Sequence, residues 1–302
     1  MKILDYEYNS PSWKFHQLSF QKVNLIVGDS GTGKTRLLNT IFNIGRFVAQ
    51  SEIGGGNSEW KLLLGVDKDQ YRWNVITEEE NNQILVKSEN LFLNNKPILN
   101  RELGEIIFNE NTTVKLPRNV MAISLLQEEE LIKPLFNGFQ RILRRRFFLD
   151  ELQKNAGIYA INQKLLEQLG EKKDLFEIYK AELALNLKLY LLSTFFPEIY
   201  EKIINKFRET FGFITEIEII DSSAFDLINI PGRAPIFCIK ELSVDEWIRL
   251  DEFSSGMQKV LLILADLFAL PSGSIYLIDE YENSLGIGPI GLLPADSGDV
   301  VH

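Results

Sequence analysis

Residues 28–35 read GDSGTGKT, which fits the phosphate-binding pattern G-x-x-x-x-G-K-[ST]. In such a turn, glycines at Gly28, Gly31 and Gly33 adopt positive φ and let backbone N–H groups approach phosphate oxygens. Lys34 is placed to reach the β- and γ-phosphates of a nucleotide, and the Thr35 hydroxyl to bind Mg²⁺. The stretch therefore predicts a nucleotide-binding phosphate loop. Its expected ligands are Gly28, Asp29, Ser30, Gly31, Thr32, Gly33, Lys34 and Thr35.

The residues on either side of the phosphate loop agree with this prediction. Val23 and the apolar run 25–27 predict a buried strand that enters the loop. Leu37, Leu38 and Ile41 recur at helical spacing after it, so the phosphates would lie at a helix N-terminus. A strand, a glycine turn and a helix in this order indicate an α/β fold.

Composition limits the classes of protein to consider. The 302 residues predict about two domains, or one large domain with an insertion. The net charge of −10 argues against a surface that is basic throughout, so nucleic acid would need a local basic patch. A single cysteine, Cys238, excludes an intramolecular disulfide and a cysteine zinc site, and suits a reducing cytosol. With only His16 and His302, a histidine cluster is excluded as well.

Neither a signal peptide nor a membrane span is expected. The N-terminus lacks a charged segment followed by a long apolar run. The longest apolar run, residues 260–270, is too short to cross a bilayer and contains Asp266. We therefore expect a cytoplasmic protein that is not integral to a membrane.

The pattern along the chain predicts three regions. Residues 1–127 form a lobe with the phosphate loop and an antiparallel β subdomain, residues 128–212 a helical insertion, and residues 213–302 the second part of the lobe. Alternating apolar residues mark the strands of the first region, and spacing of about 3.6 marks the helices of the second. The expected strands are 1–8, 13–20, 60–66, 71–76, 84–93, 112–116 and 120–126, then 216–220 and 235–239 around a turn at Pro231 and Gly232. The expected helices are a segment through Phe136, Phe139, Leu143 and Phe147, then 161–169, 175–195 and 197–211.

Four arginines form the densest basic cluster, namely Arg141, Arg144, Arg145 and Arg146. One interpretation is a solvated helix face paired with Asp150 and Glu151. The other is a contact with the phosphate backbone of DNA.

Two segments near the C-terminus complete the candidate site. The apolar run 275–278 ends in Asp279 and Glu280, which predicts a buried parallel strand that delivers two carboxylates at its C-terminal end. Beside a phosphate loop, Asp279 would hold Mg²⁺ and Glu280 would polarise the attacking water.

The signature segment, residues 253–258 (FSSGMQ), opens a helix. Ser254 and Ser255 are natural N-caps and Gly256 leaves N–H groups open to an anion, although a well-capped helix alone would have the same residues.

The order of these segments resembles the ATP-binding-cassette (ABC) ATPase heads. The closer resemblance is to the branch that includes RecF, the structural-maintenance-of-chromosomes proteins and the overcoming-lysogenisation-defect nucleases, often labelled AAA-type ATP-binding proteins. It implies a P-loop NTPase fold of ABC-ATPase type, a mixed sheet with an antiparallel β subdomain and a helical insertion. It also implies that Ser254 and Gly256 contact the γ-phosphate of ATP held by a second subunit, in a homodimer closed by two ATP molecules.

Individual positions match the family pattern unevenly. Gly28, Gly33, Lys34, Thr35, Asp279 and Glu280 match well. Ser30 stands where the family often has Asn, and Met257 where it has Gln or Glu. Gln127, at the end of the predicted strand 120–126, stands where the family has a glutamine that senses Mg²⁺, and a plain surface glutamine is the alternative.

The C-terminal residues depart from the family pattern, which continues with a helix and a strand bearing a switch histidine. Glycines and prolines from Gly286 onward disfavour a helix there, and His302 lies in the wrong context for the switch. The expectation is a shortened or frame-disrupted member, or a second polypeptide that completes the fold.

The resemblance implies a cytoplasmic Mg-ATPase that serves DNA repair, genome maintenance or anti-phage defence. No nuclease motif is visible in the sequence, so an effector would be a separate protein. The alternative is a non-hydrolysing, ATP-dependent switch or scaffold. A nucleotide kinase or GTPase is a weaker third interpretation, because neither has a place for the signature segment and no Asn-Lys-x-Asp motif is present.

Overall fold

A computed structural model describes residues 1–102, 105–113, 115–147, 154–160, 164, 167, 174–180, 183–225 and 234–281. The chain divides into two compact units. The first unit comprises Met1–Arg145 and Gly273–Asp279, and the second comprises Arg146–Ser272 and Glu280–His302. The boundary near the C-terminus therefore falls between the two predicted acidic residues, Asp279 and Glu280.

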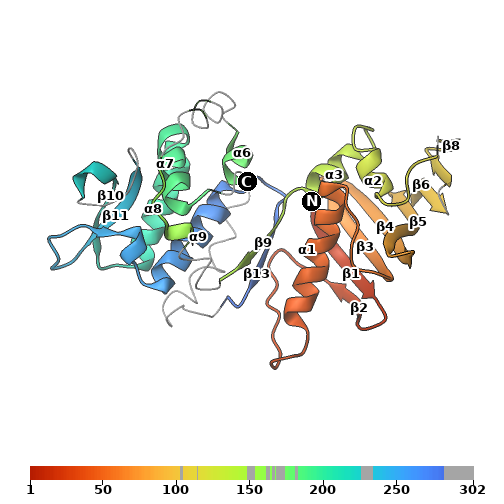
Figure 1. Ribbon diagram of the computed structural model, residues 1–302, viewed down its shortest axis with the longest axis horizontal. Coiled ribbons are helices and arrows are strands. Elements are labelled where there is room, and N and C mark those ends of the chain that lie inside the picture. Colours follow the sequence, from red (N-terminus) through yellow and green to blue (C-terminus); the bar gives the residue numbers. More distant parts are fainter. Residues whose placement is uncertain are drawn as a thin grey trace. The chain divides into compact units, whose positions relative to one another are not determined.

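The first unit contains an eight-stranded antiparallel sheet (Figure 1). It contains the predicted strands near residues 1–8, 13–20, 60–66, 71–76 and 84–93, and adds two that the pattern did not predict, β6 and β7. The strand order in the sheet is β2-β1-β3-β4-β5-β6-β7-β8. The strands are β1 (Lys2–Asn9), β2 (Lys14–Ser19), β3 (Ser58–Val66), β4 (Asp69–Glu80), β5 (Gln83–Leu93), β6 (Lys96–Glu102), β7 (Glu105–Phe108) and β8 (Asn111–Thr112).

Short asparagine turns set the register of this sheet. Asn81 and Asn82 have φ of 52° and 61°, and Asn94 and Asn95 have φ of 48° and 68°. Two consecutive left-handed residues make the tight turn whose twist matches that of antiparallel strands, and asparagine tolerates this conformation better than other residues with a Cβ. These turns join β4 to β5 and β5 to β6 directly. The sheet therefore continues across the part of the chain where the alternation of apolar and polar residues is weak.

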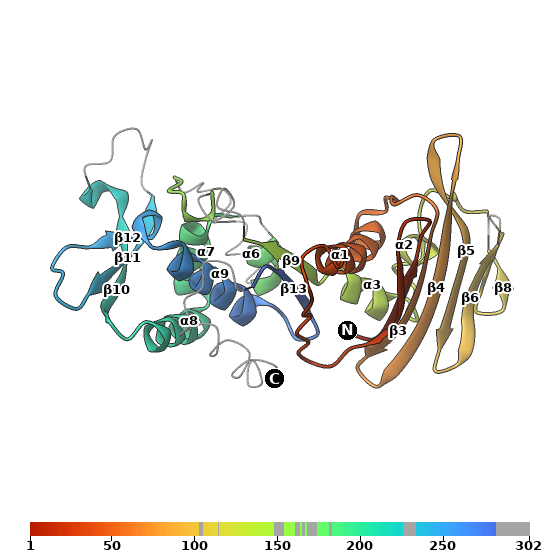
Figure 2. The ribbon, with the colours of Figure 1, turned by 90° about the horizontal axis from the view of Figure 1, so that it is seen from below.

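Three helices cover one face of the sheet in the first unit, as Figure 2 shows: α1 (Lys34–Gln50), α2 (Ala122–Leu125) and α3 (Lys133–Phe139). The predicted helix after the phosphate loop is confirmed as α1. Its apolar face buries Leu38, Ile41 and Val48 in the same core as Trp60 and Trp73 of the sheet. Burial of this face holds the N-terminus of α1, where the phosphate loop ends.

The prediction of a strand at residues 120–126 is wrong, because α2 forms there. The carboxylate of Glu89 on β5 accepts hydrogen bonds from the backbone N–H groups of Ala122 (2.6 Å) and Ile123 (3.2 Å). It therefore caps the start of the helix, an interaction that no local pattern reveals. Arg101 on β6 lies 3.8 Å from the same carboxylate, and both side chains are fully buried. Of the predicted strand 112–116, only Thr112 lies in a strand among the described residues.

The prediction of one helix from Phe136 through Phe147 is also wrong. Helix α3 ends at Phe139, and the chain continues as strand β9 (Ile142–Arg146). Strand β9 pairs with β13 (Ile275–Asp279) in a two-stranded sheet, and the N–H of Ile275 donates to the carbonyl of Arg141 at 3.0 Å. The predicted strand at 275–278 is thus confirmed, and its distant partner explains why the arginine-rich segment is extended.

Residues 20–29 form neither strand nor helix, so the predicted buried strand before the phosphate loop is wrong. Leu25 and Val27 are 82% and 81% exposed. An apolar run forms a strand only where another strand accepts its backbone hydrogen bonds, and in the described part of the chain none pairs with this one. Among the described elements, α1 is the one that continues directly from the loop.

The second unit contains helices and a small sheet. Of the predicted helix 161–169 the structure describes only residues 164 and 167, and the turn at Pro231 and Gly232 lies outside the described residues. The predicted helix 175–195 divides in two, α6 and α7, whereas the segment from Pro197 and both predicted strands are confirmed. The elements are α6 (Leu175–Lys180), α7 (Leu185–Phe195), α8 (Pro197–Thr210), β10 (Ile214–Asp221), β11 (Pro235–Glu241), β12 (Ile248–Arg249) and α9 (Ser255–Ala269), with β10-β11-β12 forming one sheet.

An aromatic cluster fixes the start of α9 within this unit. Phe253, the first residue of the signature segment, stacks on Phe207 of α8 with ring centroids 6.3 Å apart. It also meets Phe237 of β11 edge-on at 6.1 Å. Such aromatic pairs add to the burial of apolar area. The cluster therefore holds the residue that directly precedes the predicted anion-binding serines.

Among the described helices, none combines the length and the apolar character that crossing a bilayer requires.

Candidate nucleotide site

The phosphate loop has the backbone that its glycines predict, with one exception. Gly31 and Gly33 have φ of 85° and 94°, in the region that favours glycine. The expectation that Gly28 also has positive φ is wrong. A Cβ at Gly28 would instead lie 3.0 Å from the Thr32 hydroxyl, and one at Gly33 would lie 2.6 Å from the Trp13 ring. Glycine is therefore required at Gly33 both by conformation and by the neighbouring ring.

The lysine of the loop closes the turn on itself. Lys34 Nζ donates to the carbonyls of Gly28 (2.5 Å) and Asp29 (2.8 Å), and the Thr32 hydroxyl donates to the Asp29 carbonyl at 2.9 Å. Residues 28–32 are exposed. The ammonium group thus lies at the concave side of an open loop, where a phosphate oxygen could replace a carbonyl as its acceptor.

The fold brings Thr35 and Asp279 together from opposite ends of the chain. Thr35 lies in the first turn of α1 and Asp279 at the end of β13, and the Thr35 hydroxyl donates to Asp279 Oδ1 at 3.1 Å. A hydroxyl and a carboxylate oxygen side by side are ligands that suit Mg²⁺. In the described residues no three His, Cys, Asp or Glu side chains gather to hold a metal. These two groups thus fit an ion that takes its remaining ligands from phosphate and water.

The structure places Arg144 against this pair, so the prediction that the arginine cluster forms a solvated helix face is wrong. The guanidinium of Arg144 lies 2.8 Å from Asp279 Oδ2 and is only 4% exposed. It also donates to Asn39 Oδ1 on α1. Asn39 follows Thr35 by four residues, so both side chains lie on the same face of α1. Asp279 is therefore held at both oxygens, by Thr35 at one and by Arg144 at the other.

Sequence reasoning did not assign Arg144 and Asn39 to the site. The four-residue spacing of Thr35 and Asn39 in a predicted helix was a signal that both side chains lie on one face. No signal in the sequence indicated that Arg144 pairs with Asp279. The expected partners of the cluster, Asp150 and Glu151, lie outside the described residues. A DNA contact at Arg141, Arg145 and Arg146 stays a prediction.

The second predicted carboxylate has an unusual backbone. Glu280 has φ of 55°, a left-handed conformation that is uncommon for a residue with a Cβ. Its side chain is exposed. Strained residues of this kind occur often at functional sites, where the surrounding structure holds them. The same residue is held by a lysine, Lys259, which the sequence did not single out.

The signature segment belongs to the second unit and has the predicted cap. Ser254 is the N-cap of α9, and its hydroxyl accepts a hydrogen bond from the N–H of Met257 at 3.3 Å. Ser255 and Gly256 are the first two residues of the helix. The capping prediction is confirmed for Ser254, whereas Ser255 lies inside the helix, and the contact of these residues with a nucleotide stays a prediction. Gln127 lies exposed in a turn after α2, and its role as a Mg²⁺ sensor also stays a prediction.

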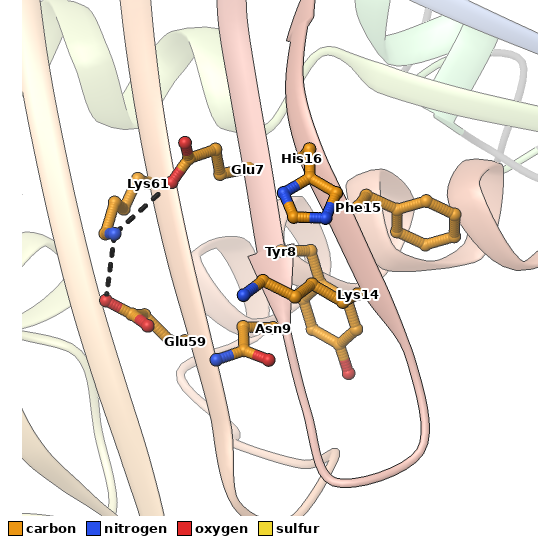
Figure 3. Close-up of a pocket in the computed structure, with 8 residues that line it drawn as sticks. All are labelled: Glu7, Tyr8, Asn9, Lys14, Phe15, His16, Glu59 and Lys61. Atoms are coloured by element: carbon orange, nitrogen blue, oxygen red, sulfur yellow. Dashed lines mark ion pairs between the residues drawn. The ribbon is translucent and has the colours of Figure 1, made fainter.

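A separate cavity of about 240 Å³ lies on strands β1, β2 and β3 (Figure 3). Lys61 at its wall pairs with Glu7 at 3.2 Å and Glu59 at 3.4 Å. Hydrogen bonding to Glu7 and the charge of Glu59 raise the pKa of Lys61. Lys61 is already paired with two carboxylates and no phosphate-loop residue lines this cavity, so we do not assign it to the nucleotide. Its lining residues are Glu7, Tyr8, Asn9, Lys14, Phe15, His16, Glu59 and Lys61.

Comparison with known proteins identifies one family. The family model described as "AAA domain, putative AbiEii toxin, Type IV TA system" matches residues 23–285. The matched range includes the phosphate loop, the signature segment and both carboxylates. No curated protein matches the chain.

Proposed function

Because the chain belongs to this AAA-domain family of P-loop ATPases, we propose that it binds Mg-ATP at residues 28–35 and hydrolyses it. The observation that carries the proposal is the 3.1 Å contact between Thr35 and Asp279, which the fold brings together beside a glycine turn. A hydroxyl at the end of a phosphate loop and a carboxylate at the end of an apolar strand are the two protein ligands that P-loop NTPases use for Mg²⁺. We propose further that the chain is an ABC-type head that dimerises around ATP.

Each site residue has a role in this proposal. Lys34 and the N–H groups of the glycine turn bind the phosphates, and Thr35 and Asp279 hold the metal. Bound Mg²⁺ neutralises charge on the phosphate oxygens. Glu280 orients and polarises the attacking water. Ser254, Ser255 and Gly256 bind the γ-phosphate of ATP held by a second copy of the chain.

The test is ATP turnover of the parent and of Glu280→Gln, with molecular mass measured by size exclusion with and without Mg-ATP. We expect turnover to fall at least about 100-fold in Glu280→Gln while the ATP-dependent dimer persists. Glu246→Gln is the matched control, because Glu246 is an exposed glutamate of the same unit outside the site. Equal turnover in the parent and Glu280→Gln would refute the role of Glu280.

One observation favours a second candidate, a switch or scaffold that closes around ATP without turnover and acts on a separate effector protein. Residues 20–29 lie outside every described sheet, so the phosphate loop lacks a rigid strand behind it. Catalysis requires groups held to within about 0.5 Å, whereas binding tolerates more movement. Dimerisation with Mg-ATP and no turnover in either protein would support this candidate.

The biological role is part of the proposal as well. We propose DNA repair, genome maintenance or anti-phage defence, and the family description, which names a toxin of a type IV toxin–antitoxin system, is nearest to defence. A DNA contact would use the arginine cluster of Arg141, Arg144, Arg145 and Arg146, in which Arg144 also binds Asp279. Anisotropy of labelled DNA at low salt tests it, and Arg145→Gln with Arg146→Gln should weaken binding. No binding by the parent would refute the contact.

A further inference from the structure

A buried lysine of helix α9 holds the backbone that follows β13. Lys259 is fully buried, and its Nζ donates to the carbonyl of Glu280 at 2.7 Å and to that of Tyr281 at 2.6 Å. The ammonium also lies 4.4 Å from the ring centroid of Phe147. All four residues belong to the second unit. Lysine is rarely buried unless its charge is satisfied, so these contacts need a reason beyond packing.

The reason lies in the conformation of Glu280. Its φ of 55° is a strained value that persists only where neighbouring groups determine it. Lys259 binds the carbonyl of Glu280 and the next carbonyl along the chain. Two consecutive carbonyls directed at one ammonium fix the peptide unit that follows Glu280. The lysine thereby stabilises the turn that leaves the Glu280 side chain exposed.

Lys259 also connects this turn to the signature segment. It lies one helical turn after Ser255, where α9 begins, and Ser254 caps the same helix. A displacement of the first turns of α9 would therefore move the ammonium that holds Glu280. The side chain of Lys259 thus joins α9, which carries the proposed nucleotide-binding serines, to the backbone of Glu280, the residue proposed to polarise the attacking water.

We infer that Lys259 is a positioning residue, which holds Glu280 in the conformation needed for hydrolysis and makes that conformation depend on α9. This inference rests on the proposed function. Lys259 acts through the Glu280 backbone and touches no reacting atom.

Two substitutions and one control test the inference. Lys259→Met keeps most of the side-chain volume and removes the ammonium, whereas Lys259→Arg keeps a charged donor. The control is Asn186→Leu. Asn186 is a buried side chain of α7 in the same unit that also donates to two backbone carbonyls, those of Ala156 and Gly157, both at 3.1 Å, and it accepts a hydrogen bond from the N–H of Phe237 at 2.8 Å. A purely structural role for Lys259 predicts similar effects for Lys259→Met and Asn186→Leu.

The positioning role predicts different effects. Turnover per folded protein should fall about 100-fold in Lys259→Met, the size of loss expected when a reacting group is displaced by about 1 Å. ATP affinity, measured by Trp fluorescence, should stay within about twofold of the parent, so the loss appears in kcat and not in KM. Lys259→Arg should recover part of the turnover, and Asn186→Leu should keep it. Turnover in Lys259→Met equal to that in Asn186→Leu would overturn the inference.

A second readout separates this inference from the proposed function. Without nucleotide, amide hydrogen exchange in residues 277–281 should be faster in Lys259→Met than in Asn186→Leu. If the parent shows no turnover, the proposed hydrolysis fails, and exchange alone decides whether Lys259 holds this segment. Unchanged exchange in Lys259→Met overturns the inference whatever the turnover.

Discussion

Replacing Arg144 with methionine tests the central feature of the first unit. Arg144 joins Asp279 on β13 to Asn39 on α1, and Thr35 binds the other oxygen of the same carboxylate. Methionine keeps most of the apolar stem and removes the guanidinium. Asp279 then retains Thr35 as a partner and loses its countercharge. We expect the free energy of unfolding of the first unit to fall.

The size of the effect follows from the burial of the pair. The ion pair is 2.8 Å long, and the two side chains are 4% and 12% exposed. Removing one partner of a fully buried pair costs about 3–5 kcal/mol. Because some water reaches Asp279 and Thr35 still donates to it, we expect about 2–3 kcal/mol, near the value for one or two hydrogen bonds to a charged group.

Urea unfolding followed by Trp fluorescence measures this loss. Three of the four Trp residues lie in the first unit, and Trp247→Phe removes the one in the second. With a slope of about 2 kcal/mol per M urea, the midpoint should fall by about 1–1.5 M. Arg46→Met is the control, because Arg46 lies on α1 of the same unit but is exposed, and its change should cost less than about 1 kcal/mol.

A double-mutant cycle with Asp279→Asn isolates the pair itself. The coupling energy between Arg144→Met and Asp279→Asn should be about 2 kcal/mol, since the two residues are in direct contact. If Arg144→Met and Arg46→Met lower the midpoint equally, or the coupling is near zero, Arg144 does not hold Asp279 and the site geometry is refuted.

Three further predictions concern buried and exposed side chains. Glu89→Gln turns one of the two oxygens that accept the Ala122 and Ile123 N–H groups into a donor and should cost about 2 kcal/mol at pH 5; because burial raises the pKa of Glu89, this stability advantage of the parent is complete below about pH 4.3, shrinks as pH rises through the folded-state pKa, and should be larger in urea unfolding at pH 5 than at pH 8. Burial raises the pKa of Cys238 to about 12, so at pH 8 a thiol reagent should label it at least about 100-fold more slowly in the folded protein than in urea, and equal rates would contradict its burial. Leu25→Thr should change the free energy of unfolding by less than about 0.5 kcal/mol, because Leu25 is exposed, whereas Leu38→Ala in the core should cost about 2–5 kcal/mol; a large loss in Leu25→Thr would show that the segment before the phosphate loop is buried.

Local signals in the sequence were sufficient for part of the fold and of the site. The glycine pattern of residues 28–35 specifies the loop, since positive φ at Gly31 and Gly33 is a property of these residues themselves. Ser254 caps α9 because a serine hydroxyl three residues before a backbone N–H can reach it without help from the rest of the chain. The pairs Asn81–Asn82 and Asn94–Asn95 also favour tight turns through their own conformational preference. They therefore indicated that the antiparallel sheet continues from one strand to the next.

Features that depend on distant partners were not predictable in this way. The segment 120–126 alternates like a strand, yet Glu89 supplies acceptors for the first N–H groups of α2 from 33 and 34 residues away. The run 23–27 has the composition of a strand and lacks a described partner. Periodicity reports which face of a segment is apolar, and not which backbone will pair with it.

The arginine cluster illustrates the same limit at the site itself. Four basic residues in six positions indicate an exposed patch on average, because isolated buried charges are costly. Arg144 escapes this cost through Asp279, which lies 135 residues away in the sequence. The sequence therefore indicated Asp279 and Glu280, because an Asp-Glu pair follows an apolar strand. It did not distinguish Arg144, which binds Asp279, from the other arginines of the cluster.

Asp279 and Glu280 are adjacent in sequence but are held in different ways, and this difference separates the functions that we propose for them. Arg144 binds Oδ2 of Asp279, so removing Arg144 should disturb Oδ1, the proposed metal ligand beside Thr35. The dependence of ATP binding on Mg²⁺ should change as a result. Lys259 binds the backbone of Glu280 and leaves its carboxylate exposed, so its removal should act on turnover at constant ATP affinity. The boundary between the two units falls between these residues. In the proposed function, metal binding thus depends on contacts of the first unit and water activation on contacts of the second, and the two steps should respond separately to substitutions in each.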